Sequence, residues 1–431
     1  IGAAYTRQDA EYGLPGHSHL NGVCHTHGID LHCEAHDEFD DPFGSSDDHT
    51  AYIDLQSERV DLRADFTDIL PGFDAIRLRG SYTDYAHAEI DGPSLFSQYT
   101  NEVYDARIEL THKPILGFVG TLGAQYTDGT FSGLNNNEVH QDKEGRPYLS
   151  ENFAIFLNER RAFGPLTIEL AARKDWREIE IPMPTYPEPS PELIERYEQA
   201  WGPNWRDRLY ERRFNSHSRA YPASKQAPFS ASISGTWNFD RGYSAALSMA
   251  RTERLPGLRE LFAYGNNLAT NSYELGLSQT SRGSAEFPES RTDVVEKTKS
   301  LDLTFRKIGG AIEFEAGLFY QDVTDYVFAR LIETDSGTGI PHNYLIYTAA
   351  NAEFYGLDGQ VSYQLDPGSR IMVFGDYVAT NLTDDDDNLP RIPPGRFGAR
   401  YEYVAGPLSA DLEYYRTFEQ DEVAAYETPT D

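Results

Sequence analysis

The stretch AIRLRGSYTDYAHAE, residues Ala75–Glu89, decides the fold, because its polarity alternates from one residue to the next. Every second residue from Ile76 to Ala88 belongs to a largely apolar set, and every second residue from Arg77 to Glu89 belongs to a polar set. Side chains of a β-strand point alternately to its two faces, so this pattern predicts a strand with one apolar and one polar face.

The same alternation recurs along most of the chain after residue 50, for example in residues 311–321 and 408–418. Each segment runs for about ten residues, the length that a tilted transmembrane strand needs. The segments are joined either by tight turns, such as Lys113-Pro114 and Gly164-Pro165, or by long loops, which cover residues 13–50, 182–226, 254–293 and 382–394. Short turns at one end and long loops at the other are typical of an outer-membrane barrel. We therefore predict an all-β fold, a transmembrane antiparallel β-barrel with long extracellular loops.

Two of the long loops carry further signals. In residues 182–226, Leu193, Tyr197 and Trp201 recur every fourth residue, which predicts a short amphipathic helix. In residues 382–394, the four consecutive acids Asp384–Asp387 predict a solvated loop tip, with a calcium site as the alternative.

Composition excludes several classes of protein. The chain has 431 residues and a formal net charge of −32 at pH 7, which argues against nucleic acid as a partner and favours cations. No run of about 18 apolar residues occurs, so no transmembrane helix is expected. The sequence also lacks the motifs of serine hydrolases, zinc peptidases, P-loop proteins and dinucleotide enzymes, so we do not expect an enzyme. Residue 1 is Ile and no signal peptide is visible, so we expect a piece of a longer protein.

The loop of residues 13–50 is a candidate metal-binding segment, because seven of the twelve histidines fall within the first 49 residues. Imidazole, thiolate and carboxylate are the ligands of zinc and related metals. The spacing does not match a closed structural zinc site, so we expect several weak, exchangeable sites that capture the ion. The candidate ligands are His17, His19, His25, His27, His32 and His36. Cys24 and Cys33 are interpreted as a disulfide, with a pair of thiolate ligands as the alternative.

Several stretches in sequence order resemble a known family. ARTERLPGLRELFAYGNNLATNSYELGL (residues 250–277) resembles the loop-and-strand signature of TonB-dependent outer-membrane receptors. GLPGHSH near the start, NAEFYGLDGQVSY (351–363), RIPPGRFGARYEY (391–403) and LEYYRTFEQDEVAAYETPT (412–430) resemble the ZnuD-type zinc receptors within that family.

The resemblance implies a barrel of about 22 strands in the bacterial outer membrane, closed by an N-terminal plug domain. Residues 1–431 would be most of that barrel, without the plug and the last strands. The expected partners are zinc as the transported substrate, the TonB complex through the absent plug, outer-membrane lipid and lipopolysaccharide. The function implied is zinc import. The alternatives are import of haem or another metal complex, and a metal-scavenging adhesin that transports nothing.

The resemblance also implies an internal metal site. Glu89 aligns with a glutamate ligand of the zinc receptors, and His87 shares its strand face by the alternation described above. The family takes a further ligand from a histidine of the loop that here reads AYGNNLATN, where this chain has Asn267. Three interpretations stay open: another histidine such as His112 or His342 substitutes, the site is weaker, or the substrate differs. The non-metal interpretation is that His87 and Glu89 form a polar pair with Arg77 or Arg79. Residues 254–277 contain no histidine, which argues against a haem ligand there.

Overall fold

The computed structural model describes residues 1–13, 23–27, 30–34, 51–92, 94–135, 146–267, 272–279, 289–335, 341–425 and 427–429. Most of these residues form strands, and 18 of the strands belong to one sheet. The strands that form the wall are β1 (Gly2–Gly13), β4 (Ala51–Thr67), β5 (Phe73–Asp91), β6 (Ser94–His112), β7 (Val119–Asn135), β8 (Arg146–Phe163), β9 (Leu166–Glu180), β11 (Phe229–Asp240), β12 (Tyr243–Arg254), β15 (Glu296–Lys307), β16 (Ile312–Asp335), β17 (Pro341–Asp366), β18 (Ser369–Leu382), β19 (Arg396–Ala405) and β20 (Leu408–Thr417).

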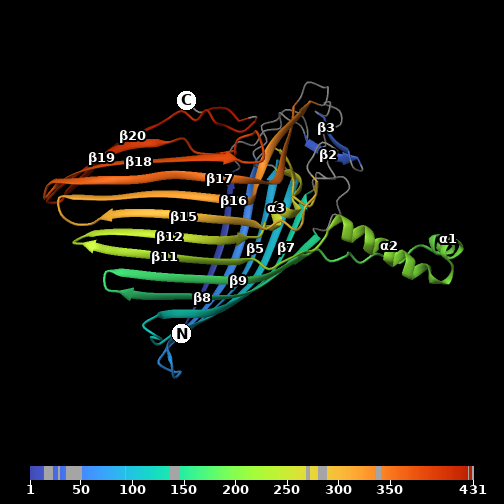
Figure 1. Ribbon diagram of the computed structural model, residues 1–431. Helices are drawn as coiled ribbons and strands as arrows, with labels where there is room; N and C mark the ends of the chain where they lie inside the picture. The colour runs from blue at the N-terminus through green and yellow to red at the C-terminus, as the bar shows by residue number, and fades with distance from the viewer. Residues whose placement is uncertain are drawn as a thin grey trace.

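Each of these strands pairs antiparallel with the next in this order, from β1 with β4 to β19 with β20. The sheet curves around a lumen, with β5 and β7 behind the layer of β8 to β20 in Figure 1. The strands have 10 to 26 residues, so many are longer than predicted and extend beyond the thickness of a membrane. The predicted antiparallel all-β fold is confirmed.

The longest connections all lie at one end of the strands. The turns after β4, β8 and β19 are short, whereas the connections after β1, β9 and β12 are long and lie at the opposite end. We call the end with the long connections the mouth. Two short strands, β2 (Val23–His27) and β3 (Asp30–Glu34), form a separate hairpin there (Figure 1).

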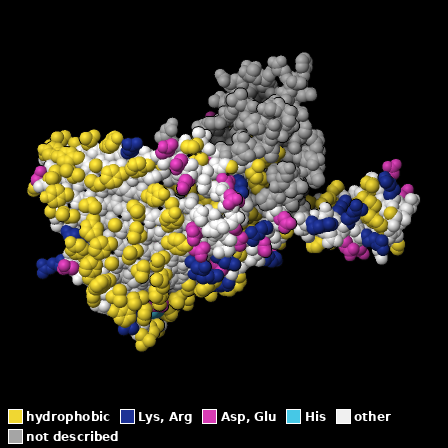
Figure 2. Space-filling view, turned by 45° about the horizontal axis from the view of Figure 1, so that its top comes forward, with side chains coloured by type: hydrophobic (Ala, Val, Ile, Leu, Met, Phe, Trp, Pro, Cys, Tyr) yellow, Lys and Arg dark blue, Asp and Glu magenta, His cyan; other side chains and the backbone are white. Residues whose placement is uncertain are grey.

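Apolar side chains cover the outer face of the wall (Figure 2). Leu62, Ala106, Tyr126, Phe153 and Trp176 follow one another across neighbouring strands, with Gly80 between the first two. The four large side chains of this row are exposed. Because directly opposite residues of paired strands lie on the same face, the register makes one continuous apolar surface from the alternating pattern of each strand. This surface is the one that a lipid-facing wall requires.

A belt of tyrosines borders the apolar surface toward the mouth. The Tyr82 and Tyr104 hydroxyls both donate to Glu102, at 3.0 and 3.1 Å, and the Tyr126 hydroxyl donates to Glu151 at 3.2 Å. Such rings suit the boundary between lipid and water, because one end is apolar and the other is hydrogen-bonded.

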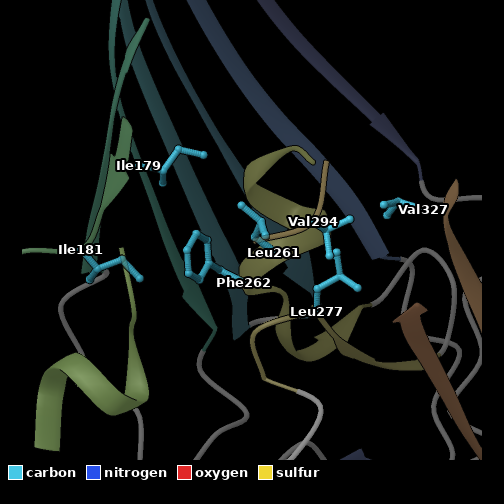
Figure 3. Close-up of a cluster of buried hydrophobic side chains, with 7 residues drawn as sticks. All are labelled: Ile179, Ile181, Leu261, Phe262, Leu277, Val294 and Val327. Carbon is cyan, nitrogen blue, oxygen red and sulfur yellow. The ribbon is translucent and has the colours of Figure 1, made fainter. Parts of the chain in front are cut away.

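The apolar core lies inside the mouth, where the connection between β12 and β15 folds back into the lumen. This connection, residues 255–295, contains α3 (Leu258–Phe262), β13 (Tyr264–Asn267) and β14 (Ser272–Leu275), so it is more ordered than the predicted loop. Figure 3 shows the buried cluster that holds it, and its members are Ile179, Ile181, Leu261, Phe262, Leu277, Val294 and Val327. Two ion pairs fasten its ends, Arg254 to Glu296 at 2.9 Å and Arg291 to Asp325 at 2.8 Å.

The connection between β9 and β11 forms a helical arm that extends away from the barrel (Figure 1). It consists of α1 (Pro191–Trp201), a 3₁₀ turn η1 (Gly202–Asn204) and α2 (Trp205–Ala220), followed by β10 (Ser224–Gln226). The short helix predicted around Leu193, Tyr197 and Trp201 is confirmed as α1, and α2 is a second helix that was not predicted. The predicted stripe ends at Trp201 because Gly202, at φ 71°, and Pro203 stop α1, and Tyr197 stacks on both Trp201 and Trp205 across the break. No helix among the described residues is long and apolar enough to cross a membrane.

Candidate functional site

His87 and Glu89 lie on the inner face of β5, close to its end at the mouth. The opposite face carries Leu78, which is exposed on the outer wall. Glu89 is 8% exposed and accepts a hydrogen bond from the Ser97 hydroxyl of β6. Arg77 contacts Asp65 and Glu109, so the non-metal interpretation does not hold for Arg77.

The His87 ring lies between two tyrosines. Its centroid is 4.8 Å from that of Tyr99, in a stacked arrangement, and 5.5 Å from that of Tyr85, edge to face. Its Nδ1 atom is buried and has no hydrogen-bond partner among the described residues. A buried polar atom without a partner is costly, so this nitrogen is a natural ligand for a group that enters the mouth.

An aromatic row continues from this site to the folded connection inside the mouth. Phe131 lies 6.2 Å from Tyr99, Tyr148 lies 6.0 Å from Phe131, and Phe262 of α3 lies 5.5 Å from Tyr148, measured between ring centroids. The row therefore joins β5 to α3 across three neighbouring strands. It gives the inner wall near Glu89 an apolar lining that keeps the site poor in water.

Charged side chains of the folded connection also reach the site. Arg259 of α3 donates two hydrogen bonds to Glu274 of β14, one of them from Nε at 2.8 Å. These bonds raise the pKa of Arg259 further above its usual value. The Arg259 side chain is 55% exposed and the Glu274 side chain 6%, and both groups lie within electrostatic range of Glu89. The carboxylate charge around Glu89 is therefore only partly neutralised.

Asn267 occupies the end of β13, directly opposite Ser272 of β14. It lies in the same folded connection as Arg259, so the position at which the resemblance implies a histidine belongs to the mouth. His112, the predicted substitute, does not. It lies at the opposite end of β6 beside a short turn, where its Nε2 is 2.8 Å from Glu159 and its Nδ1 is 2.7 Å from the Lys113 carbonyl.

The other suggested substitute, His342, is at a register position opposite Thr334, and its side chain lies outside the described residues. Within the part of the chain that the structure describes, no three His, Cys, Asp or Glu side chains lie close enough together to hold a metal ion. Among the described residues of the mouth, the predicted ligands present are His87 and Glu89.

The predicted capture loop is described in part. His17, His19 and His36 lie outside the described residues. His25, His27 and His32 belong to the β2–β3 hairpin, in which Cys24 is directly opposite Cys33. The backbone here is a hairpin and not the extended loop that the sequence suggested, and β2 contacts β13 of the mouth.

The acidic run Asp384–Asp387 is only partly the solvated tip that was predicted, because Asp384 and Asp386 are exposed whereas Asp385 and Asp387 are half-buried. Arg330 forms an ion pair with Asp385, at 2.5 Å, and Asp387 accepts a hydrogen bond from the Ala425 amide at 2.9 Å. The hydrogen bond from Arg330 lowers the pKa of Asp385. The acidic run therefore connects residues 383–395 to β16 through Arg330 and to the C-terminal segment through Ala425.

Sequence reasoning missed Ser97, Arg259, Glu274 and the aromatic row. The row had a detectable signal, because Tyr99, Phe131 and Tyr148 each belong to the inward set of an alternating segment. The ion pair between Arg259 and Glu274 had no signal in the sequence, because it depends on how the connection between β12 and β15 folds back.

Comparison with known proteins identifies the family. Residues 4–430 match the family described as TonB dependent receptor-like, beta-barrel. The chain belongs to the TonB-dependent receptor family. It is therefore an outer-membrane protein, and the mouth with its long loops is the extracellular end of the barrel.

Solved structures of other receptors share the fold at low sequence identity. The copper transporter OprC is 15% identical, with a TM-score of 0.64, over 87% of this chain and 58% of OprC. The FrpB iron transporter from Neisseria meningitidis (F5-1 variant) is 10% identical, with a TM-score of 0.56, over 85% of this chain and 52% of FrpB. A double mutant of the Serratia marcescens hemophore receptor HasR, in complex with its hemophore HasA and heme, is 10% identical, with a TM-score of 0.56, over 85% of this chain and 59% of HasR. This TonB-dependent receptor barrel thus spans little more than half the length of these structures.

Proposed function

We propose that this receptor imports zinc through a site at the extracellular mouth to which His87 and Glu89 contribute. The observation that carries the proposal is the unpartnered, buried Nδ1 of His87 on the same inner face as the buried carboxylate of Glu89. An imidazole nitrogen and a carboxylate oxygen are both good zinc ligands. A tight site needs three or four ligands, so the remaining ones come from outside these two residues, as in the zinc receptors that the sequence resembles.

The electrostatics of the chain support a cationic substrate. The net charge of −32 attracts divalent cations toward the mouth and repels anionic chelates. In the proposed sequence of events, the histidines of residues 13–50 capture the ion outside, the mouth binds it, and a plug domain coupled to the TonB complex carries it through. The chain then acts in binding and transport, without catalysis.

The test is a competition titration on the full-length, plug-containing receptor with zinc, copper, nickel, manganese and haem. We expect zinc to bind, and Glu89→Gln to weaken it at least about tenfold, which is about 1.4 kcal/mol. The matched control is Glu109→Gln, because Glu109 is also a buried glutamate of the inner wall but pairs with Arg107, at 2.7 Å, away from the mouth. Zinc affinity that is the same in Glu89→Gln and in the unchanged receptor would reject the site.

The alternatives separate in related measurements. Haem import predicts that haem outcompetes zinc, although residues 254–277 have no histidine to serve as an axial ligand. A metal-scavenging adhesin predicts zinc binding at the surface without uptake. Import predicts that cells accumulate radioactive zinc and that this accumulation requires TonB, whereas scavenging predicts no such accumulation.

A further inference from the structure

The outer face of the wall carries a cluster of cations at the extracellular edge of the apolar surface. Lys174 of β9 is two residues from Trp176, so the two side chains share the outer face. The register continues this face across β11 to Arg251 of β12, which is directly opposite Lys299 of β15. Lys297 is two residues from Lys299, nearer the mouth. We call Lys174, Arg251, Lys297 and Lys299 the basic patch.

The basic patch is accessible and only partly neutralised. The Arg251 side chain is 50% exposed and the Lys299 side chain 71%, and Lys297 is also exposed. Arg251 pairs with Glu253 at 2.6 Å, and Lys299 pairs with Asp322 at 3.0 Å. Four cations and two carboxylates leave a net charge of +2. Exposed ion pairs of this kind are weak, so another anion can replace either carboxylate at little cost.

The corresponding edge of the apolar surface on β5 to β8 has the opposite sign. Asp84 is directly opposite Glu102, and Asp128 is directly opposite Glu151, beside the belt of tyrosines. These four acids share the outer face with the tyrosines that donate to them. In a chain with a net charge of −32, the basic patch is therefore a local exception that attracts anions.

An apolar surface adjoins the basic patch on the side away from the mouth. Ile233, Met249 and Leu301 are directly opposite one another on β11, β12 and β15, and they are 50%, 49% and 43% exposed. Met249 is two residues from Arg251, so cation and apolar side chain are neighbours on one face. Figure 2 shows this change on the side that it presents, where charged side chains replace the yellow surface toward the helical arm. The combination fits an amphiphile with an anionic head and apolar chains.

We propose that the basic patch binds the phosphate groups of one lipopolysaccharide molecule of the outer leaflet, and that its acyl chains lie on Ile233, Met249 and Leu301. The mouth is the extracellular end of the barrel, so this edge faces the outer leaflet, where lipopolysaccharide carries phosphates next to its acyl chains. Guanidinium and ammonium groups form strong, charge-assisted hydrogen bonds with phosphate. The site lies on the outside of the wall, so it does not depend on zinc binding at His87 and Glu89.

The test measures binding of purified lipopolysaccharide to the full-length receptor in detergent, with EDTA present so that divalent cations cannot bridge the lipid to the acidic strands. We expect Arg251→Gln with Lys297→Gln and Lys299→Gln to weaken binding at least about tenfold. Lys297→Arg with Lys299→Arg should retain it, because the charges remain.

The matched control is Lys307→Gln. Lys307 lies on the same face of β15 at the end far from the mouth, opposite Tyr243, and should not affect binding. Equal affinity in the triple variant and the unchanged receptor, or an equal loss in Lys307→Gln, would overturn the proposal.

Two further ligands identify what the basic patch recognises. Dephosphorylated lipopolysaccharide and phosphatidylglycerol should each bind at least about tenfold more weakly than lipopolysaccharide. Equal binding of the first would show that phosphate is not recognised, and equal binding of the second would show a general anionic-lipid surface; either result overturns the proposal. Added salt should weaken binding to the unchanged receptor, a test that needs no variant. Binding that is insensitive to salt would also contradict the proposal.

Discussion

Replacing Leu261 by Ala should loosen the connection between β12 and β15 without unfolding the barrel. Leu261 is 1% exposed and packs in the cluster with Phe262, Leu277 and Val294. Truncation of a fully buried leucine costs about 3 kcal/mol in transfer and cavity terms. The cost falls on the folded connection, because the strands of the wall have their own hydrogen-bonded ladder.

Since about 1.4 kcal/mol is a factor of ten in an equilibrium, local opening should become more than about 100-fold more frequent. The amides of Gly276, Leu277 and Ser278 report it, because they donate to Ala263, Glu260 and Leu261 across the connection. Hydrogen exchange followed by mass spectrometry should show faster exchange in residues 258–279 and no change in β11.

The control is Leu193→Ala, because Leu193 is 38% exposed on the helical arm. It should leave the exchange of residues 258–279 unchanged. Unchanged exchange in Leu261→Ala, or faster exchange spread equally over β11, would refute the argument that this cluster is what holds the connection in the lumen.

Two further predictions concern the wall and the rim. A Cβ at Gly123 would lie 2.1 Å from the Phe156 ring, so Gly123→Ala should displace that ring from Arg107 and cost about 1–3 kcal/mol of stability. The folded fraction seen on unheated gels should fall. The control Gly235→Ala should not lower it, because the nearest atom to a Cβ there is 3.8 Å away. Because the pKa of Asp385 is lowered in the folded state, its pairing with Arg330 stabilises the rim above the ordinary aspartate pKa and is lost as pH falls below it. Cleavage of the C-terminal segment by an acid protease should therefore begin only below about pH 4 in the unchanged receptor. In Arg330→Ala, cleavage should begin at a higher pH. The same onset pH in the variant and the unchanged receptor would contradict the role of the pair.

Much of the architecture could be predicted because it depends on a local rule. The alternation in Ala75–Glu89 shows which side chains leave on each face of the strand, whatever the strand pairs with. The same rule placed His87 and Glu89 together on the inner face. It could not show that many strands extend past the membrane, because polar residues at strand ends resemble loops.

The candidate site was less predictable, because its members are brought together by register and by a fold-back over many residues. His112 was suggested as a substitute for the histidine missing at Asn267, but pairing between β5 and β6 places it opposite Phe73 at the far end of the strand. The ion pair of Asp385 was not predicted, because its partner, Arg330, comes from a strand more than fifty residues earlier.

The sequence by itself determined that this protein is built from strands with one apolar and one polar face, because a two-residue period in the side chains is a property of the extended backbone alone. Only the tertiary structure decided what surrounds Glu89. Those contacts depend on where each turn begins, since a shift of one residue would move every side chain of a strand to the other face.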